Sequence, residues 1–255
     1  MGITLSYKSQ GAAGSPIVIL HGLLGSSSNW RSIARQLAEH HRVFTLDLPN
    51  HGESPHVDHM SYPAMAQDVR DFLDSHAIET ATFIGHSMGG KTAMRLALDA
   101  CERLDRLVVV DIAPTPSHHD HSLWLRAMAG LDMARITRRS DAEHMLETAV
   151  PDAAMRQFLL QNLTSTPQGF AWRINLPGIE ASLPALLDFP VEANVRPFTG
   201  PTLFLRGGQS DYILERDEKV IRSLFPRAEI VTIEDAGHWL HAEQPARFLE
   251  ALGSV

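Results

Sequence analysis

TFIGHSMGGKTA, residues 82–93, is the stretch that decides the fold of this chain. It starts as an apolar run, turns within the frame GHSMG at residues 85–89, and continues as a helical pattern. A serine between two glycines at such a turn is typical of a nucleophile elbow, which lifts the serine hydroxyl above the end of a sheet. Gly85 and Gly89 would leave room for the close passage of strand and helix. We therefore predict that Ser87 is a nucleophile rather than a residue of a simple tight turn.

Short apolar runs alternate with helical patterns on both sides of this turn. An opening strand is expected where Ile3, Leu5 and Tyr7 alternate with polar residues. The other predicted strands are mostly apolar. Strands of that kind are covered on both faces, as in a parallel sheet built from βαβ units. The sequence thus predicts a doubly wound, mostly parallel α/β core. The further strands are predicted at 16–20, 42–46, 81–84, 107–110, 202–205 and 229–233, and the helices at 30–39, 64–75, 91–100, 216–224 and 245–252.

The alternation stops between residues 114 and 189. This stretch has helical patterns, for example at 123–131, 142–149 and 153–160, and no convincing strand. A helical insertion between two strands of one sheet is expected to sit over the strand ends. We predict a core formed by residues 1–113 and 190–255, with residues 114–189 as an all-helical cap.

The composition limits the classes of partner. The chain of 255 residues has 22 basic and 30 acidic residues, a formal net charge of −8, and no basic run, which argues against nucleic acid or an anionic membrane as a partner. No apolar run approaches the roughly 20 residues needed to span a bilayer. Cys101 is the single cysteine, and no secretory signal is visible at the N-terminus. We expect a cytoplasmic protein with a small-molecule partner; the sequence predicts no particular oligomeric state.

A serine nucleophile requires a base, and the position of His238 favours it among the 14 histidines. His238 follows the last predicted strand and precedes the last predicted helix, and Gly237 before it allows the loop to bring the ring over Ser87. His241, three residues further on, is the weaker candidate for the base, and we expect it to be a cap or surface histidine.

Two aspartates compete to orient the imidazole. Asp211 lies in the glycine-rich turn RGGQSDYI and gives the chain order Ser, Asp, His, which is the common one for a nucleophile elbow. Asp111 ends the predicted strand VVVD, within reach of a histidine above Ser87. We favour Asp211 and keep Asp111 as the alternative acid.

The remaining parts of the predicted site are an oxyanion hole and a pocket wall. The backbone amides of Leu23, in the turn HGLLG, and of Met88, at the start of a helix, can face the same point. Aromatic and aliphatic cap residues are more often packing residues, so the wall set is a hypothesis. The proposed wall residues are Trp124, Phe158, Trp172, Leu176 and Trp239.

The run HHDH at residues 118–121 invites a metal hypothesis. Its spacing is that of a loop, without the i, i+4 pair of a helical zinc site, and no further ligand cluster accompanies it in the sequence. We predict no metal site and no cofactor, and interpret His118, His119, Asp120 and His121 as a solvated stretch at the cap entrance.

These residues together resemble the α/β-hydrolases nearly end to end. The matching segments are HGLLGSSSNW, DLPNHGES, GHSMGGKTAM, VVVDIAP and AGHWLHAEQP, and the last two, with WRINL, are similar to small YbfF-type bacterial esterases and their abhydrolase-domain relatives. The resemblance implies hydrolysis of esters or thioesters by Ser87 and His238. It also implies an acid at the position of Asp111, although this sequence carries Asp211 in the later turn as well.

We therefore expect a serine esterase that cleaves carboxylic esters of small to medium acyl groups through an acyl-enzyme. One alternative is an acyl-CoA thioesterase, in which Arg126, Arg138 and Arg139 would meet phosphates. An alternative from another class is a ligand receptor that keeps the fold but has little turnover. An intact Ser, His and Asp set favours the enzyme.

Overall fold

A seven-stranded sheet forms the core of the protein in a computed structural model that describes residues 2–192 and 194–253. The strand order is β1-β3-β2-β4-β5-β8-β9, with β1 antiparallel to β3 and every other neighbour parallel. The predicted mostly parallel sheet is thereby confirmed; residues 1, 193, 254 and 255 of the predicted core lie outside the described residues. The strands are β1 (Tyr7–Gln10), β2 (Pro16–Leu20), β3 (Arg42–Leu46), β4 (Ala81–His86), β5 (Leu104–Val110), β8 (Thr202–Gly207) and β9 (Ala228–Ile233).

The register of the parallel strands aligns their carboxyl ends. Leu20 lies opposite Leu46 and Gly85, and Val110 lies opposite His86 and Leu205. The loops that follow β2, β4, β5 and β8 therefore leave the sheet at one edge. In open α/β sheets this edge is where ligands bind.

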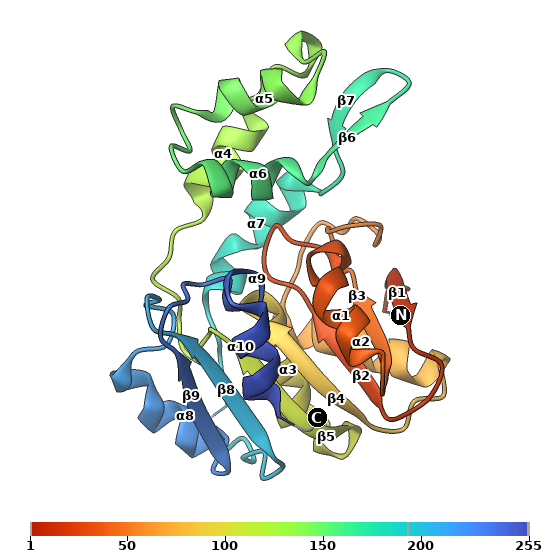
Figure 1. The fold of residues 1–255 in the computed structure, drawn as a ribbon, viewed down its shortest axis with the longest axis vertical. Coiled ribbons are helices and arrows are strands. Elements are labelled where there is room, and N and C mark those ends of the chain that lie inside the picture. The colour runs from red at the N-terminus through yellow and green to blue at the C-terminus, as the bar shows by residue number, and fades with distance from the viewer. Residues whose placement is uncertain (1, 193, 254–255) are drawn as a thin grey trace.

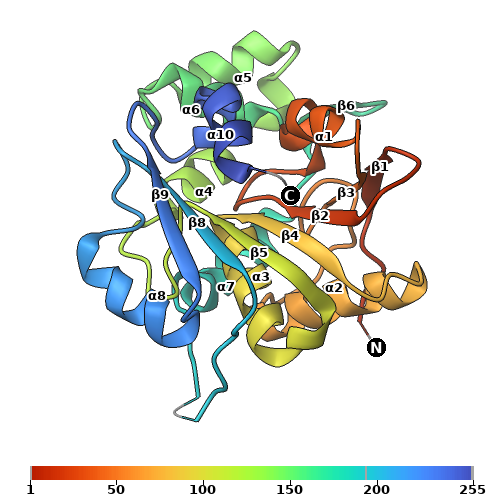
Figure 2. The same cartoon turned by 60° about the horizontal axis from the view of Figure 1, so that its bottom comes forward.

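Helices cover both faces of the sheet (Figure 2), and alternate residues of its central strands pack against opposite helical layers. Ile17, Ile19 and their neighbours pack against α1 (Arg31–Leu37) and α10 (Pro245–Leu252), next to the short α9 (Leu240–Glu243). Val18, Leu20 and their neighbours pack against α2 (Tyr62–Ser75), α3 (Met88–Asp99) and α8 (Glu218–Leu224). Strands buried on both faces explain the continuous apolar runs of the sequence. Short 3-10 turns occupy η1 (Ser27–Trp30), η2 (Cys101–Arg103), η3 (Met133–Arg135) and η4 (Glu215–Asp217).

The opening strand begins later in the chain than the alternation predicts. Tyr7 is the first residue of β1, whereas Ile3 and Leu5 precede the strand. Leu5 is buried in the core, and the Ile3 N–H donates to Asp68 Oδ1 at 3.0 Å. Of these three apolar residues only Tyr7 pairs in the sheet, opposite Leu46, whereas Ile3 and Leu5 belong to a segment fixed by a buried leucine and one side-chain hydrogen bond.

The inserted segment rises above the carboxyl edge of the sheet as a separate layer (Figure 1). Its helices α4, α5 and α6 lie furthest from the sheet, and α7 lies between them and the core. The prediction of an all-helical cap is wrong, because a two-stranded antiparallel hairpin follows α6. The cap elements are α4 (Ser122–Ala129), α5 (Arg139–Leu146), α6 (Ala153–Leu160), β6 (Leu163–Thr166), β7 (Gly169–Trp172) and α7 (Leu176–Leu187).

The hairpin escapes detection in the sequence because its strands are four residues long and only Leu163 is buried. Its two-residue loop is held by Thr166, whose hydroxyl donates to the Gly169 carbonyl at 2.9 Å. Gly169 has φ +118°, a conformation that favours glycine. Trp172 Nε1 donates to the Met128 carbonyl at 3.0 Å and ties the hairpin to α4. A short, half-exposed hairpin has no apolar run for a sequence pattern to reveal.

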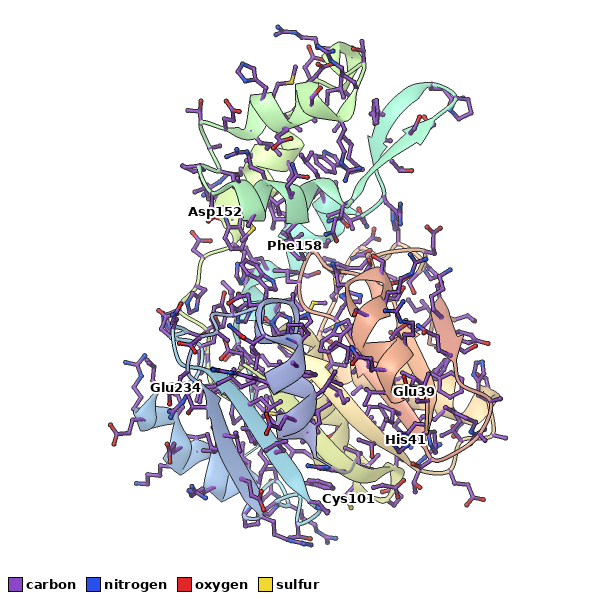
Figure 3. All side chains as sticks on the ribbon, in the orientation of Figure 1. Glu39, His41, Cys101, Asp152, Phe158 and Glu234 are labelled. Atoms are coloured by element: carbon purple, nitrogen blue, oxygen red, sulfur yellow. The ribbon has the colours of Figure 1, made fainter. Side chains whose placement is uncertain are left out.

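Polar contacts fasten the cap to the core. Asn162 Nδ2 donates to the Leu24 carbonyl at 2.8 Å, and the Met60 N–H donates to Ser182 Oγ at 2.7 Å. Phe158, labelled in Figure 3, lies where α6 faces the core. Buried hydrogen bonds between distant segments restrict the geometry of such a junction. No helix among the described residues is long and apolar enough to cross a bilayer.

Candidate active site

Ser87 occupies a strained turn between β4 and α3. Its φ of 50° and ψ of −116° lie outside the regions that most residues adopt. A Cβ added at Gly85 would lie 2.4 Å from the Gly89 carbonyl oxygen, and one added at Gly89 would lie 2.4 Å from the Leu20 carbonyl oxygen. The two glycines are therefore required because backbone of β2 and α3 passes where a side chain would be.

Ser87 lines a cavity between sheet and cap together with Leu23 and Met88. Met88 is the first residue of α3, so its N–H has no carbonyl partner within the helix. The positive end of the α3 dipole faces the same place. The cavity therefore brings the predicted nucleophile beside both residues of the predicted oxyanion hole.

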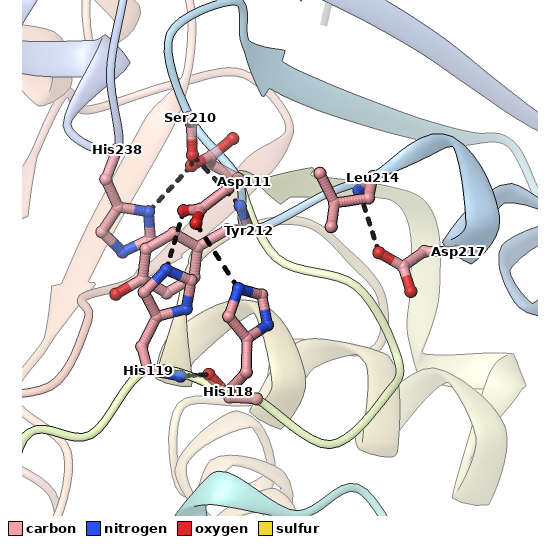
Figure 4. A network of polar contacts seen from close by, with 10 residues as sticks. Asp111, His118, His119, Ser210, Tyr212, Leu214, Asp217 and His238 are labelled. Atoms are coloured by element: carbon pink, nitrogen blue, oxygen red, sulfur yellow. Dashed lines mark hydrogen bonds and ion pairs between the residues drawn. The ribbon is translucent and has the colours of Figure 1, made fainter.

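Asp111 and His238 meet at the next strand of the sheet. Asp111 follows β5 with φ 50°, is fully buried, and accepts a hydrogen bond from His238 Nδ1 at 2.8 Å through its Oδ2 (Figure 4). Its Oδ1 accepts the Gly207 N–H at 2.9 Å, and Ser210 Oγ also donates to Oδ2. Three donors hold the carboxyl in one orientation, which fixes the His238 ring with Nε2 directed away from the acid.

Asp211 does not contact His238, contrary to the favoured prediction. Its carboxylate pairs with His119 Nε2 at 2.7 Å and His118 Nε2 at 3.5 Å, and its side chain is 65% exposed. The reason lies in the turn after β8, where Ser210 points inward to Asp111 and the next residue points outward. The acid that contacts the imidazole of His238 is therefore Asp111, the alternative in the sequence analysis.

Burial shifts the proton affinities of this pair. Desolvation lowers the pKa of His238, so its imidazole is neutral at neutral pH and can accept a proton. Desolvation also raises the pKa of the Asp111 carboxyl, against the hydrogen bonds from Ser210 and Gly207. A neutral imidazole held by a buried carboxyl is the arrangement that a general base requires.

The His238 ring is stacked at the edge of the cavity. Tyr212, which lines the cavity with Ser87, stacks on His238 at a centroid distance of 3.6 Å. The backbone carbonyl of His238 is bonded to His86 Nε2 at 2.9 Å, next to the elbow in sequence. His241 instead lies buried against Trp30, with ring centroids 4.0 Å apart. It is thus a packing residue of the core.

Comparison with known proteins places this geometry in a family. A family model described as alpha/beta hydrolase fold matches residues 15–245. The chain belongs to the α/β-hydrolase fold family.

Known proteins that resemble this α/β-hydrolase along most of its length indicate the group of the family to which it belongs. The sn-1-specific diacylglycerol lipase ABHD11 of Mus musculus is 41% identical over 247 residues, which cover 93% of this chain and 80% of the relative. Esterase YbfF of Escherichia coli (strain K12) is 38% identical over 239 residues, 93% of this chain and 91% of the relative. A solved marine microorganism esterase superposes with a TM-score of 0.94 at 38% identity, covering 98% of each chain. The protein is an enzyme of the esterase and lipase group of this family.

The five residues predicted to form the pocket wall lie elsewhere in this α/β-hydrolase. Leu176 is buried at the start of α7, and Trp172 is bonded to α4. Trp124 packs near His121. Trp239 and Phe158 contact each other across the junction of core and cap, with centroids 5.6 Å apart. None of the five lines the cavity at Ser87.

Apart from Ser87, Leu23 and Met88, the cavity wall consists of residues that were not predicted to form it, among them His121, which is buried and not solvated as expected. Lys91 is buried and donates from Nζ to the Leu187 and Asp188 carbonyls, each at 3.1 Å. Burial lowers its pKa to about 8. The sequence did contain a signal for Lys91 as a wall residue, because it follows Ser87 by four residues and therefore lies on the same face of the helix. The apolar wall residues are Tyr62, Ile112, Leu183, Leu186 and Leu187.

The three arginines considered for a phosphate site already have partners. Arg126 Nη2 donates to Ser122 Oγ at 2.6 Å, and Arg138 pairs with Asp141 at 3.0 Å. Arg139 Nη2 donates to the Leu160 carbonyl. None of the three lines the cavity at Ser87, so they give no support to an acyl-CoA site.

Proposed function

We propose that this enzyme hydrolyses carboxylic esters of small to medium acyl groups, with Ser87 as nucleophile, His238 as general base and Asp111 as the acid that orients it. The observation that carries the proposal is the 2.8 Å contact between Asp111 Oδ2 and His238 Nδ1, made at the strand next to the elbow. Asp111 replaces Asp211 in this set because of that contact.

In the first step the Ser87 hydroxyl attacks the ester carbonyl while His238 Nε2 accepts its proton. Asp111 keeps the imidazole in the tautomer with a proton on Nδ1 and stabilises the imidazolium that forms. The lowered pKa of His238 supports this role, because the resting ring is unprotonated.

The negative charge of the tetrahedral intermediate develops on the former carbonyl oxygen. The N–H groups of Leu23 and Met88 are proposed to bind it, and the N-terminus of α3 adds its dipole. Loss of one such donor typically lowers turnover by about 10²–10³. The protonated His238 then transfers its proton to the departing alcohol, leaving an acyl group on Ser87.

Water completes the reaction by the same groups in reverse. His238 takes a proton from water, the hydroxide attacks the acyl carbon, and Ser87 leaves with the proton returned by the imidazole. The product is a carboxylic acid, and the enzyme regains its starting protonation state.

The acyl group is proposed to lie against Leu183, Leu186 and Leu187, which form an apolar wall next to Ser87. An apolar pocket with a single cation at its side suits an uncharged chain near an ester. Relatives named as esterases and as a diacylglycerol lipase support ester substrates.

Hydrolysis of p-nitrophenyl esters from acetate to palmitate by the wild type and by Ser87→Ala tests this proposal. We expect turnover with an optimum at short or medium chains, a burst of one product equivalent per enzyme, and loss of both in the variant. Equal rates for the two proteins across the series would contradict it. Turnover confined to acyl-CoA, or ligand binding without turnover, would instead support the thioesterase or receptor alternative.

A further inference from the structure

A cluster of three potential metal ligands lies beside the proposed active site. His118 and His119 come from the segment that leads into the cap, and Asp211 comes from the loop after β8. One ligand atom of each residue lies within 4.8 Å of the others. Figure 4 shows both imidazole rings directed toward one carboxylate. The fold thus supplies the third ligand that the HHDH run lacks in the sequence.

The separations in this cluster suit a small divalent ion. His119 Nε2 lies 2.7 Å and His118 Nε2 lies 3.5 Å from the Asp211 carboxylate. Zinc–nitrogen bonds of about 2.0–2.1 Å in a tetrahedron hold neighbouring ligand atoms about 3.3 Å apart. Small side-chain rotations are enough to reach that spacing.

The charge of the cluster suits a cation. Asp211 supplies a carboxylate, an anionic ligand whose oxygens contact His119 Nε2 and His118 Nε2. No arginine or lysine pairs with the Asp211 carboxylate within the described residues. Two imidazoles and one carboxylate leave a fourth position for water, and imidazole ligands favour transition metals over Mg²⁺ or Ca²⁺.

An ion can reach the cluster from solvent. His118, His119 and Tyr212 line a second cavity of about 170 Å³, which also borders Arg216 and Asp217. The His118 and Asp211 side chains are 51% and 65% exposed. Entry therefore requires no opening of the core.

We propose that His118, His119 and Asp211 bind a divalent transition-metal ion of the Zn²⁺ type. The bound ion joins the cap-entry segment to the loop after β8, in addition to the side-chain contacts that already link them. His119 stacks on Tyr212 and Tyr212 stacks on His238, each at 3.6 Å, so the ion also restrains the residues next to the base.

Competition between untagged, metal-free protein and a chromophoric chelator for Zn²⁺ tests the site. We expect one equivalent to bind the wild type, and His118→Ala and Asp211→Asn each to weaken binding tenfold or more. His144→Ala is the matched control, because His144 is an exposed cap histidine paired with Glu147 at 3.1 Å and has no third ligand among the residues that the structure describes. Its affinity should equal that of the wild type.

Thermal unfolding with and without Zn²⁺ gives a second readout, since an ion that binds only the folded state raises its midpoint. The midpoint should rise for the wild type and His144→Ala and stay unchanged for the two ligand variants. The proposal is overturned if the wild type does not bind Zn²⁺ at 100 times the protein concentration. It is also overturned if the ligand variants, folded by circular dichroism, bind as tightly as the wild type.

Discussion

His21 and His51 brace each other's loops in a reciprocal arrangement. The loop that carries His51 donates the Leu48 N–H to His21 Nε2, and the loop that carries His21 donates the Leu24 N–H to His51 Nε2, both at 3.0 Å. The two rings lie 5.1 Å apart. The turn with the proposed oxyanion donor Leu23 is therefore held by histidine side chains.

The hydrogen bonds fix the protonation of both rings. Because each Nε2 accepts an N–H, each proton lies on Nδ1, which bonds to the Gly22 carbonyl in His21 and the Pro49 carbonyl in His51 at 2.8 Å. Burial lowers the pKa of His51 from 6.5 to about 3 and lowers that of His21 as well. Both residues stabilise the fold as neutral rings.

The first prediction is a loss of stability in mild acid. The unfolded chain binds protons at these histidines below pH 6.5 and the folded chain does not, so the free energy of unfolding decreases as the pH falls from 6.5 toward 3. His51 alone contributes about 1.7 kcal/mol of this decrease between pH 6.5 and 5.0. Urea unfolding at pH 7.5, 6.5, 5.75 and 5.0 measures it.

A His51→Gln variant separates this residue from other titrating groups. The pH slope of the unfolding free energy should be smaller in the variant by about one proton. A free energy of unfolding that stays constant from pH 7.5 to 5.0 in the wild type would contradict the account.

The second prediction concerns Gly89→Ala. Its Cβ would lie 2.4 Å from the Leu20 carbonyl oxygen, which belongs to the backbone of β2 and cannot rotate away. We expect a loss of about 1–3 kcal/mol in unfolding free energy, as for overpacked cores, and a larger fall in kcat because the elbow moves. Gly130→Ala, whose Cβ would lie 3.2 Å from the Arg126 carbonyl in the cap, is the comparison. Similar kcat losses in both variants would refute a special role for the elbow glycine.

The third prediction concerns acyl length. Leu183→Trp adds bulk to the apolar wall near Ser87, so kcat/KM for octanoate esters should fall at least tenfold relative to acetate. Leu123→Trp makes the same change at a cap position that is 53% exposed and should leave the ratio unchanged. A preference that does not change in Leu183→Trp would place the acyl group elsewhere.

Much of the fold follows from local sequence signals. The strands at 16–20 and 42–46 are found where they are predicted, and the first of them is an unbroken apolar run because it is covered on both faces. The elbow is recognisable because Gly85 and Gly89 reflect backbone crowding, which no other residue type relieves.

The direction of a side chain in a loop cannot be predicted from such local sequence signals. Ser210 and Asp211 are adjacent in one turn, yet the first points to Asp111 and the second to His119. A strand ladder has a period of two, but an irregular turn has none, so the sequence alone cannot decide between Asp111 and Asp211. The cavity wall depends likewise on how α7 lies over α3, which is a long-range contact.

The measurement that tests the proposed function most directly is kcat/KM for a short-chain ester in Asp111→Asn and Asp211→Asn, side by side at neutral pH. Asparagine keeps the shape of each side chain and removes its charge. We predict a fall of about 10²–10⁴ for Asp111→Asn, because the imidazole loses its orienting acid. In metal-free protein, Asp211→Asn should stay within about threefold of the wild type, since its carboxylate pairs with His119 and His118 and does not contact the base. The reverse order, with Asp211→Asn the more damaged variant, would contradict the Ser87, His238 and Asp111 set.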